Sequence, residues 1–188
     1  MDIREILLDY LRSTREGLLW KAAGLSEREL RLPRTPTGTN LLGLIKHCAG
    51  VEHGYLVDCF GRTSTVTLTM PDFDADPNAD MYAGPDESAA DLIDLYRRVG
   101  EAVEESVRSM DLTTPGHVPW WGERGATTLG RVLVHVLADV SRHAGQADIL
   151  REGIDGVAGL APGNGNLWEP ADGWEAHVAR LTALADGT

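Results

Sequence analysis

The sequence has few of the features that mark membrane proteins and nucleic-acid-binding proteins. No apolar run is long enough to span a bilayer, and residues 1–21 alternate charged and apolar residues instead of showing a basic start followed by an apolar block. We therefore expect a cytoplasmic protein with no membrane partner.

Basic residues are also scarce: the chain has 17 Lys and Arg against 29 Asp and Glu, for a net charge of −12. This balance argues against nucleic acid as a partner, since binding phosphates requires a basic surface.

Cysteine is nearly absent, and the two cysteines present, Cys48 and Cys59, fall within one predicted helix. Their separation along such a helix corresponds to about 16 Å, well beyond the reach of a disulfide. Two cysteines also provide no zinc-finger spacing. We therefore expect no disulfide within this helix and no cysteine-based metal site, and we interpret Cys48 as a core residue.

Helical periodicity is the dominant pattern that is present. Apolar residues recur at three- and four-residue steps, which predicts four long helices at about 2–23, 40–60, 86–109 and 127–152. A chain of 188 residues, 43% hydrophobic and 24% charged, is long enough for one globular domain and short for two. Four long helices in one domain predict an all-α fold, a four-helix bundle. The cores of such bundles are a usual place for metal sites built from facing helices.

The connections between these helices are predicted to be long and irregular. Residues 61–85 are rich in Asp, Pro, Thr and Gly and are expected to cross the surface, and "HVPWW" is expected to be a short extended piece or a hairpin arm. We expect a single domain over 1–188 with a helical core over 1–155. Residues 156–188 are expected to form an irregular segment followed by a short helix near 174–185.

The last long predicted helix carries a group of polar residues, namely His135, Asp139, His143 and Gln146. Asp139 and His143 differ by about 40° around the helix axis and by about 6 Å along it, so both can reach one point. Their arc also contains apolar residues and should face the core, where an unpaired carboxylate or imidazole is costly. Two interpretations are open: a His–Asp–His hydrogen-bond network or partly exposed helix edge, and a metal site completed by a ligand from another element.

The second predicted helix offers such a ligand, because His47 borders its core-facing residues. Three glycines follow one edge of the same helix: Gly43, Gly50 and Gly54. Glycine lets a neighbouring backbone approach closely, so we interpret this edge as the seam against the last long helix. His135 and His143 are about 12 Å apart along their axis and cannot share one ion. The pair that serves a metal is therefore either 135/139 or 139/143.

Three segments of the sequence resemble a known superfamily. They are "TPTGTNLLGLIKHCAGVEHGYL", "VPWWGERG" and "TTLGRVLVHVLADVSRHAGQADILREGIDG". They are similar to the DinB-like superfamily, specifically its actinobacterial branch of mycothiol-dependent enzymes, which includes maleylpyruvate isomerase and mycothiol S-transferases. The resemblance covers about residues 1–155 and implies a four-helix bundle that holds a divalent metal, zinc or nickel, through His47, Asp139 and His143. Relatives often carry His or Glu in place of Asp139, and a histidine in place of Gln146.

The resemblance also implies a function. A low-molecular-weight thiol such as mycothiol would bind the metal as a thiolate and attack a small electrophile, as in an S-transferase, or add reversibly in a thiol-dependent isomerisation. His135 and Gln146 are expected to support a ligand or line the pocket. Tyr55, Trp120 and Trp121 are expected to be pocket walls or to cap the bundle. No catalytic residue beyond the metal ligands is identified.

Other functions are compatible with the same residues. A metal-dependent hydrolase would use a metal-activated water, and a metal-binding stress-response protein would have no turnover. The expected partners are a small thiol and a small electrophile, with no nucleic acid and no membrane. A homodimer is compatible with the sequence.

Overall fold

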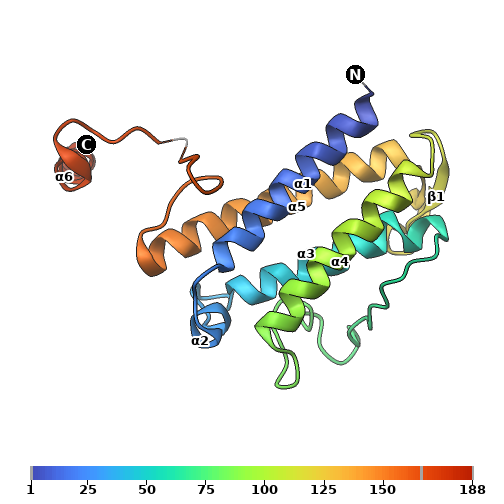
Figure 1. The fold of residues 1–188 in the computed structure, drawn as a ribbon. Coiled ribbons are helices and arrows are strands. Elements are labelled where there is room, and N and C mark those ends of the chain that lie inside the picture. The colour runs from blue at the N-terminus through green and yellow to red at the C-terminus, as the bar shows by residue number, and fades with distance from the viewer. Residues whose placement is uncertain (1, 166, 188) are drawn as a thin grey trace. The chain divides into compact units, whose positions relative to one another are not determined.

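Four long helices dominate the structure. A computed structural model describes residues 2–165 and 167–187. The long helices are α1 (Ile3–Ala22), α3 (Leu41–Leu56), α4 (Ala89–Arg108) and α5 (Leu129–Asp155) (Figure 1). Across the described residues, the strands are confined to one two-stranded sheet. The predicted all-α fold is confirmed.

Polar side chains fix the starts of several helices. Asp2, Asn40 and Ser88 accept hydrogen bonds from backbone N–H groups in the first turns of α1, α3 and α4. The short helix α2 (Glu27–Arg31) begins with a capping box at Ser26. Each cap satisfies N–H groups that have no partner within the helix, which is why the helices begin at these residues.

Two helix ends differ from those predicted. α3 ends at Leu56, and a separate 3-10 helix, η1 (Asp58–Phe60), follows it. Cys59 therefore lies outside the helix that contains Cys48; both cysteines are free and buried. α5 continues past the predicted end near residue 152 and stops at Gly156, which adopts the left-handed conformation (φ 78°) that favours glycine.

A small hairpin precedes α5. β1 (Pro115–His117) pairs antiparallel with β2 (Ala126–Thr128), and the 3-10 helix η2 (Pro119–Arg124) connects them. Proline at the first position of η2 has no N–H to give to a strand ladder and has a backbone angle suited to a helical turn. The segment "HVPWW" thus contributes only its histidine to a strand, and both of its tryptophans lie in η2.

The hydrophobic core lies among the four long helices. α1 packs along α5, and α3 packs against both α4 and α5 (Figure 1). Each of the four long helices contributes fully buried side chains to this core, for example Leu11, Leu44, Val99 and Leu133. Burying one such side chain contributes roughly 1.5–3 kcal/mol. Because α3 lies against both α4 and α5, its polar side chains can contact residues of either helix.

A hydrogen-bonded ion pair crosses this core. Arg15 of α1 donates to Glu52 of α3 at 2.6 Å, and the phenol of Tyr96 of α4 donates to the same carboxylate at 2.6 Å. Glu52 and Tyr96 are completely buried. Burial raises the pKa of the Tyr96 phenol well above its ordinary value, so the phenol keeps the proton that it donates. Gly100 leaves space for the guanidinium, since a Cβ at that position would lie 2.4 Å from Nη1 of Arg15.

The chain divides into two compact units, one ending at Ala158 and the other beginning at Gly159. The second unit contains α6 (Gly173–Asp186), in which every described side chain is at least partly exposed. Within the described ranges, no helix combines the length and the apolar character needed to cross a membrane.

The buried ion pair predicts a large loss of stability when its acid is removed. Glu52→Ala leaves the buried Arg15 charge with the longer ion pair to Glu104, at 3.5 Å, in place of its bond of 2.6 Å to Glu52, and removing one member of a buried pair costs about 3–5 kcal/mol in comparable sites. Chemical denaturation should show this loss in the free energy of unfolding. The matched variant Glu101→Ala, at an exposed position of α4, should change it by less than about 0.5 kcal/mol. A Glu52→Ala protein as stable as this control would contradict the assignment.

Candidate metal centre

Three potential ligands meet where α3 packs against α5. His47 comes from α3, and Asp139 and His143 come from α5, one helical turn apart. Each offers one ligand atom, and these atoms all lie within 4.8 Å of one another. The imidazoles of His47 and His143 stand edge to face with their centroids 4.7 Å apart, and Nε2 of His143 lies 3.6 Å from Oδ1 of Asp139. All three residues are half-buried.

The ring nitrogens of both histidines are arranged as metal-binding imidazoles require. Nδ1 of His47 is 2.6 Å from Oδ2 of Asp80, and Nδ1 of His143 is 2.8 Å from Oε1 of Gln146. Carboxylate and amide oxygens only accept hydrogen bonds, so each Nδ1 carries the proton. The Nε2 lone pair of each ring is then free to bind a cation, which is the usual arrangement around protein metals.

The donor set suits a divalent ion such as zinc. Two imidazoles and one carboxylate are three protein ligands, which leave the fourth position of a tetrahedral ion for water or substrate. Ligand atoms around such an ion lie roughly 3.3 Å apart, given metal–ligand distances of about 2.0–2.2 Å. The separation of 3.6 Å between His143 and Asp139 is close to this value.

Asp80 reaches His47 because its segment is held tightly against α3. A Cβ at Gly43 would lie 1.8 Å from the backbone oxygen of Met81, so only glycine admits the segment at this distance. The side-chain amide of Asn40 donates to the same oxygen at 3.2 Å, and Nζ of Lys46 donates to the carbonyl of Ala79 at 2.9 Å. These contacts on both sides of residue 80 orient its carboxylate toward His47.

The glycine seam predicted against α5 is wrong. Gly43 faces Met81 of the connection between η1 and α4, and the nearest atom to a Cβ at Gly54 would be the Trp120 ring at 3.8 Å. A Cβ at Gly50 would meet no atom within 4 Å. The close approach that a glycine edge suggests is therefore real at one position, but the backbone that approaches is an irregular segment and not a helix.

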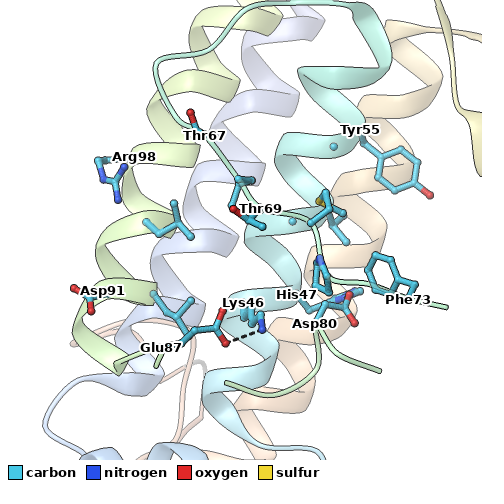
Figure 2. A pocket seen from close by; sticks show the side chains of 18 of the residues that line it. Lys46, His47, Tyr55, Thr67, Thr69, Phe73, Asp80, Glu87, Asp91 and Arg98 are labelled. Carbon is cyan, nitrogen blue, oxygen red and sulfur yellow. Dashed lines mark hydrogen bonds and ion pairs between the residues drawn. The ribbon is translucent and has the colours of Figure 1, made fainter. Parts of the chain in front are cut away.

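A pocket of about 670 Å³ opens beside the three ligands and includes His47 and Asp139 in its wall (Figure 2). Figure 2 shows His47 beside Asp80, and the salt bridge of 2.8 Å between Lys46 and Glu87 on the same wall. The connection between η1 and α4, expected to cross the surface, supplies a wall of the pocket through residues 67–71. Sequence reasoning missed Asp80 because nothing in its spacing distinguishes it from the other acidic residues of that segment.

The aromatic residues singled out in the sequence form one cluster. The Tyr55 hydroxyl accepts hydrogen bonds from the indoles of Trp120 at 2.6 Å and Trp121 at 3.1 Å. Tyr55 and Trp120 line the large pocket. His135 is exposed, and its ring lies 5.1 Å from that of Tyr55 and 5.0 Å from that of Trp121. His135 thus belongs to the aromatic cluster and is not one of the three potential ligands. Gln146, in contrast, contacts the potential ligand His143 directly.

Neighbouring polar residues of α3 have other partners. Cys48 is fully buried, and burial raises the pKa of its thiol well above the ordinary value, with a further increase from the charges of Glu52 and Asp139. The thiol is therefore protonated and poorly suited to nucleophilic attack. Glu52 binds Arg15, and His53 is buried with its Nδ1 at 3.1 Å from Asp58.

Comparison with known proteins adds one finding. The sequence model of the mycothiol-S-transferase family matches residues 6–156, a range that contains all three potential ligands and the aromatic cluster. No curated protein sequence matches the chain significantly.

The geometry predicts that His47 is required for metal binding. His47→Ala removes one of three ligands, so it should lower zinc affinity by more than the roughly 10- to 100-fold that loss of a supporting hydrogen bond costs. Elemental analysis and competition with a chromogenic chelator, on protein without an affinity tag, measure this. His117→Ala, at an exposed histidine outside the group, should retain about one zinc per chain. Full retention of zinc by His47→Ala would rule out the centre.

A second prediction concerns the support of His47. Asp80→Ala removes the acceptor that fixes its tautomer, so zinc affinity should fall roughly 10- to 100-fold. Gly43→Ala should weaken zinc binding in the same direction, because the added methyl group displaces Met81 and with it Asp80. The control is Asp74→Ala, which removes an exposed carboxylate from the same segment. Equal zinc affinities for Asp80→Ala and Asp74→Ala would show that Asp80 has no such role.

Proposed function

The chain belongs to the mycothiol S-transferase family, and from this premise we propose that it transfers the sulfur of mycothiol, or of a similar small thiol, to a small electrophile at a divalent metal held by His47, Asp139 and His143. The observation that carries the proposal is the meeting of three ligand atoms, two of them from residues in the wall of a pocket of about 670 Å³. Pockets of roughly 300–1,000 Å³ are typical of small-molecule sites.

The residues present fit a zinc ion, and they also fit nickel, since imidazole suits both. Bound there, the ion would lower the pKa of a coordinated thiol so that the thiolate is present at neutral pH. Cys48, which follows His47 in α3, is fully buried, so its thiol is poorly placed to attack a substrate in the pocket. This supports a thiol that enters as a substrate.

The pocket wall supports a thiol on a hydroxyl-rich scaffold. Mycothiol is a cysteine-derived thiol attached to a sugar-like polyol. Hydroxyl and carboxylate groups that can exchange hydrogen bonds with a polyol line the pocket, including those of Thr67, Thr69 and Asp91 (Figure 2). Leu92 and Leu95 give the same wall an apolar part. A wall with both polar and apolar side chains is suited to a polar ligand that carries a short apolar group.

The chain's contribution to the reaction is to bind and orient both substrates. With a haloarene as the acceptor, one carbon–sulfur bond forms, the carbon–halogen bond breaks, and halide leaves with the bonding electrons while the thiol proton passes to solvent. Holding the sulfur and the acceptor carbon together converts a bimolecular reaction into an effectively unimolecular one. A thiol-dependent isomerisation would use the same thiol site and regenerate the thiol at the end.

Thiol-dependent turnover tests this proposal. Zinc-loaded protein with mycothiol should consume 1-chloro-2,4-dinitrobenzene faster than mycothiol alone, which is followed by the absorbance of the thioether product. Asp139→Ala should reduce the enzymatic rate at least roughly 100-fold, since it removes a ligand rather than a supporting group. Glu101→Ala serves as the matched control, because its carboxylate is exposed and lies outside the pocket wall.

The competing functions give different results in the same assay. Hydrolysis of an ester such as p-nitrophenyl acetate by the zinc-loaded protein without any thiol would favour a hydrolase and contradict the proposal. Stoichiometric zinc binding without turnover of maleylpyruvate, the haloarene or the ester would favour a metal-binding protein that is not an enzyme, and would also contradict it.

A further inference from the structure

A second hollow of about 370 Å³ lies between η2 and the first turns of α5. Its wall consists of two tryptophans, two arginines and one histidine: Trp120, Trp121, Arg124, Arg131 and His135. None of the described residues in its wall is acidic, although the chain as a whole carries a net charge of −12. A basic hollow in an acidic protein favours a negatively charged occupant.

Both arginines of this hollow are available to a ligand. Over the part of the chain that the structure describes, neither Arg124 nor Arg131 forms an ion pair or a side-chain hydrogen bond, whereas Arg12, Arg15 and Arg151 bind carboxylates of the protein. Arg131 lies over the Trp121 ring, with Cζ 5.1 Å from the ring centroid. This contact holds the guanidinium by its face and leaves its N–H groups, which match a carboxylate in geometry, without a partner.

The hollow adjoins the large pocket. Trp120 lines both of them. Tyr55, in the wall of the large pocket, lies against His135 of the hollow and accepts hydrogen bonds from both indoles. His135 precedes Asp139 by one turn of α5, about 6 Å along the axis. The wall of the hollow therefore comes within one helical turn of Asp139, one of the potential metal ligands.

From these observations we propose that the hollow is the subsite for the acceptor, and that the preferred acceptor is a flat, unsaturated or aromatic molecule that carries a carboxylate. The carboxylate is bound by Arg124 and Arg131, and the flat part packs on the indoles, which interact well with aromatic rings. The assignment of the occupant as the acceptor rests on the proposed transferase function, because the thiol occupies the large pocket. Arg124 and Arg131 are then specificity-determining residues.

Two acceptors that differ only in charge test the proposal, namely 4-chloro-3,5-dinitrobenzoate and 4-chloro-3,5-dinitrobenzamide. In both, the new carbon–sulfur bond replaces the carbon–chlorine bond and chloride leaves. Zinc-loaded protein with mycothiol should show a higher kcat/KM for the benzoate, after correction for the uncatalysed rates. Arg131→Gln and Arg124→Gln should each lower kcat/KM for the benzoate roughly tenfold, as expected for the loss of one charged hydrogen bond, and lower that for the benzamide by a much smaller factor.

The matched control is Arg97→Gln, which removes the same charge from an exposed position of α4 that lies outside both pocket walls. It should leave the preference for the benzoate intact. If Arg97→Gln reduces the preference as much as Arg131→Gln does, the effect comes from net charge and the subsite is ruled out.

Calorimetry separates failure of this proposal from failure of the transferase function, because it requires no turnover. The zinc-loaded protein should bind 3,5-dinitrobenzoate more tightly than 3,5-dinitrobenzamide, and Arg131→Gln should remove most of the difference. Equal binding of the two, or benzoate binding that is unchanged in both arginine variants, overturns the subsite. Arginine-dependent benzoate binding without turnover of any acceptor supports the anion subsite and contradicts the transferase function.

Discussion

The packing of α3 against α5 is the contact on which the candidate site depends. It brings His47 against Asp139 and His143, three polar side chains that would be costly at a helix contact without partners. A divalent cation at this place would remove the cost, because it would neutralise the carboxylate and bind both free Nε2 lone pairs. The contact that stabilises the bundle and the contact that builds the centre are therefore the same.

The remaining parts of the site depend on elements that pack around this contact. The connection between η1 and α4 supplies Asp80 to orient His47, and Gly43 permits its close approach. The hairpin before α5 supplies the tryptophans that meet Tyr55. Family membership supports the proposed thiol donor, whereas the basic hollow formed by η2 and the first turns of α5 bears on the proposed choice of acceptor. Irregular segments thus surround a centre that two regular helices position.

The fold and the shared face of Asp139 and His143 follow from patterns that the sequence carries directly. Helical periodicity predicts four long helices, and a spacing of four residues places Asp139 and His143 on one face. The choice of His143 over His135 as the partner of Asp139 came from a family resemblance, because helical geometry allows both pairs. In the structure His135 lies with Tyr55 and Trp121 instead.

Other features have no local signal in the sequence. Asp80 approaches His47 across 33 positions of chain, and its role depends on where an irregular segment packs. The wrong assignment of the glycine edge has the same origin, since a missing side chain shows that something approaches but not which element does. The buried pairing of Arg15 with Glu52 likewise depends on how α1 and α3 pack, which periodicity does not specify.

The central claim is that a small thiol binds to a metal held by His47, Asp139 and His143. Visible absorption of the cobalt-substituted protein, titrated with mycothiol, tests it most directly. The account predicts the bands of a four-coordinate cobalt ion and, as mycothiol is added, a new thiolate-to-cobalt charge-transfer band that is absent in Asp139→Ala. A cobalt spectrum that saturating mycothiol leaves unchanged would contradict it.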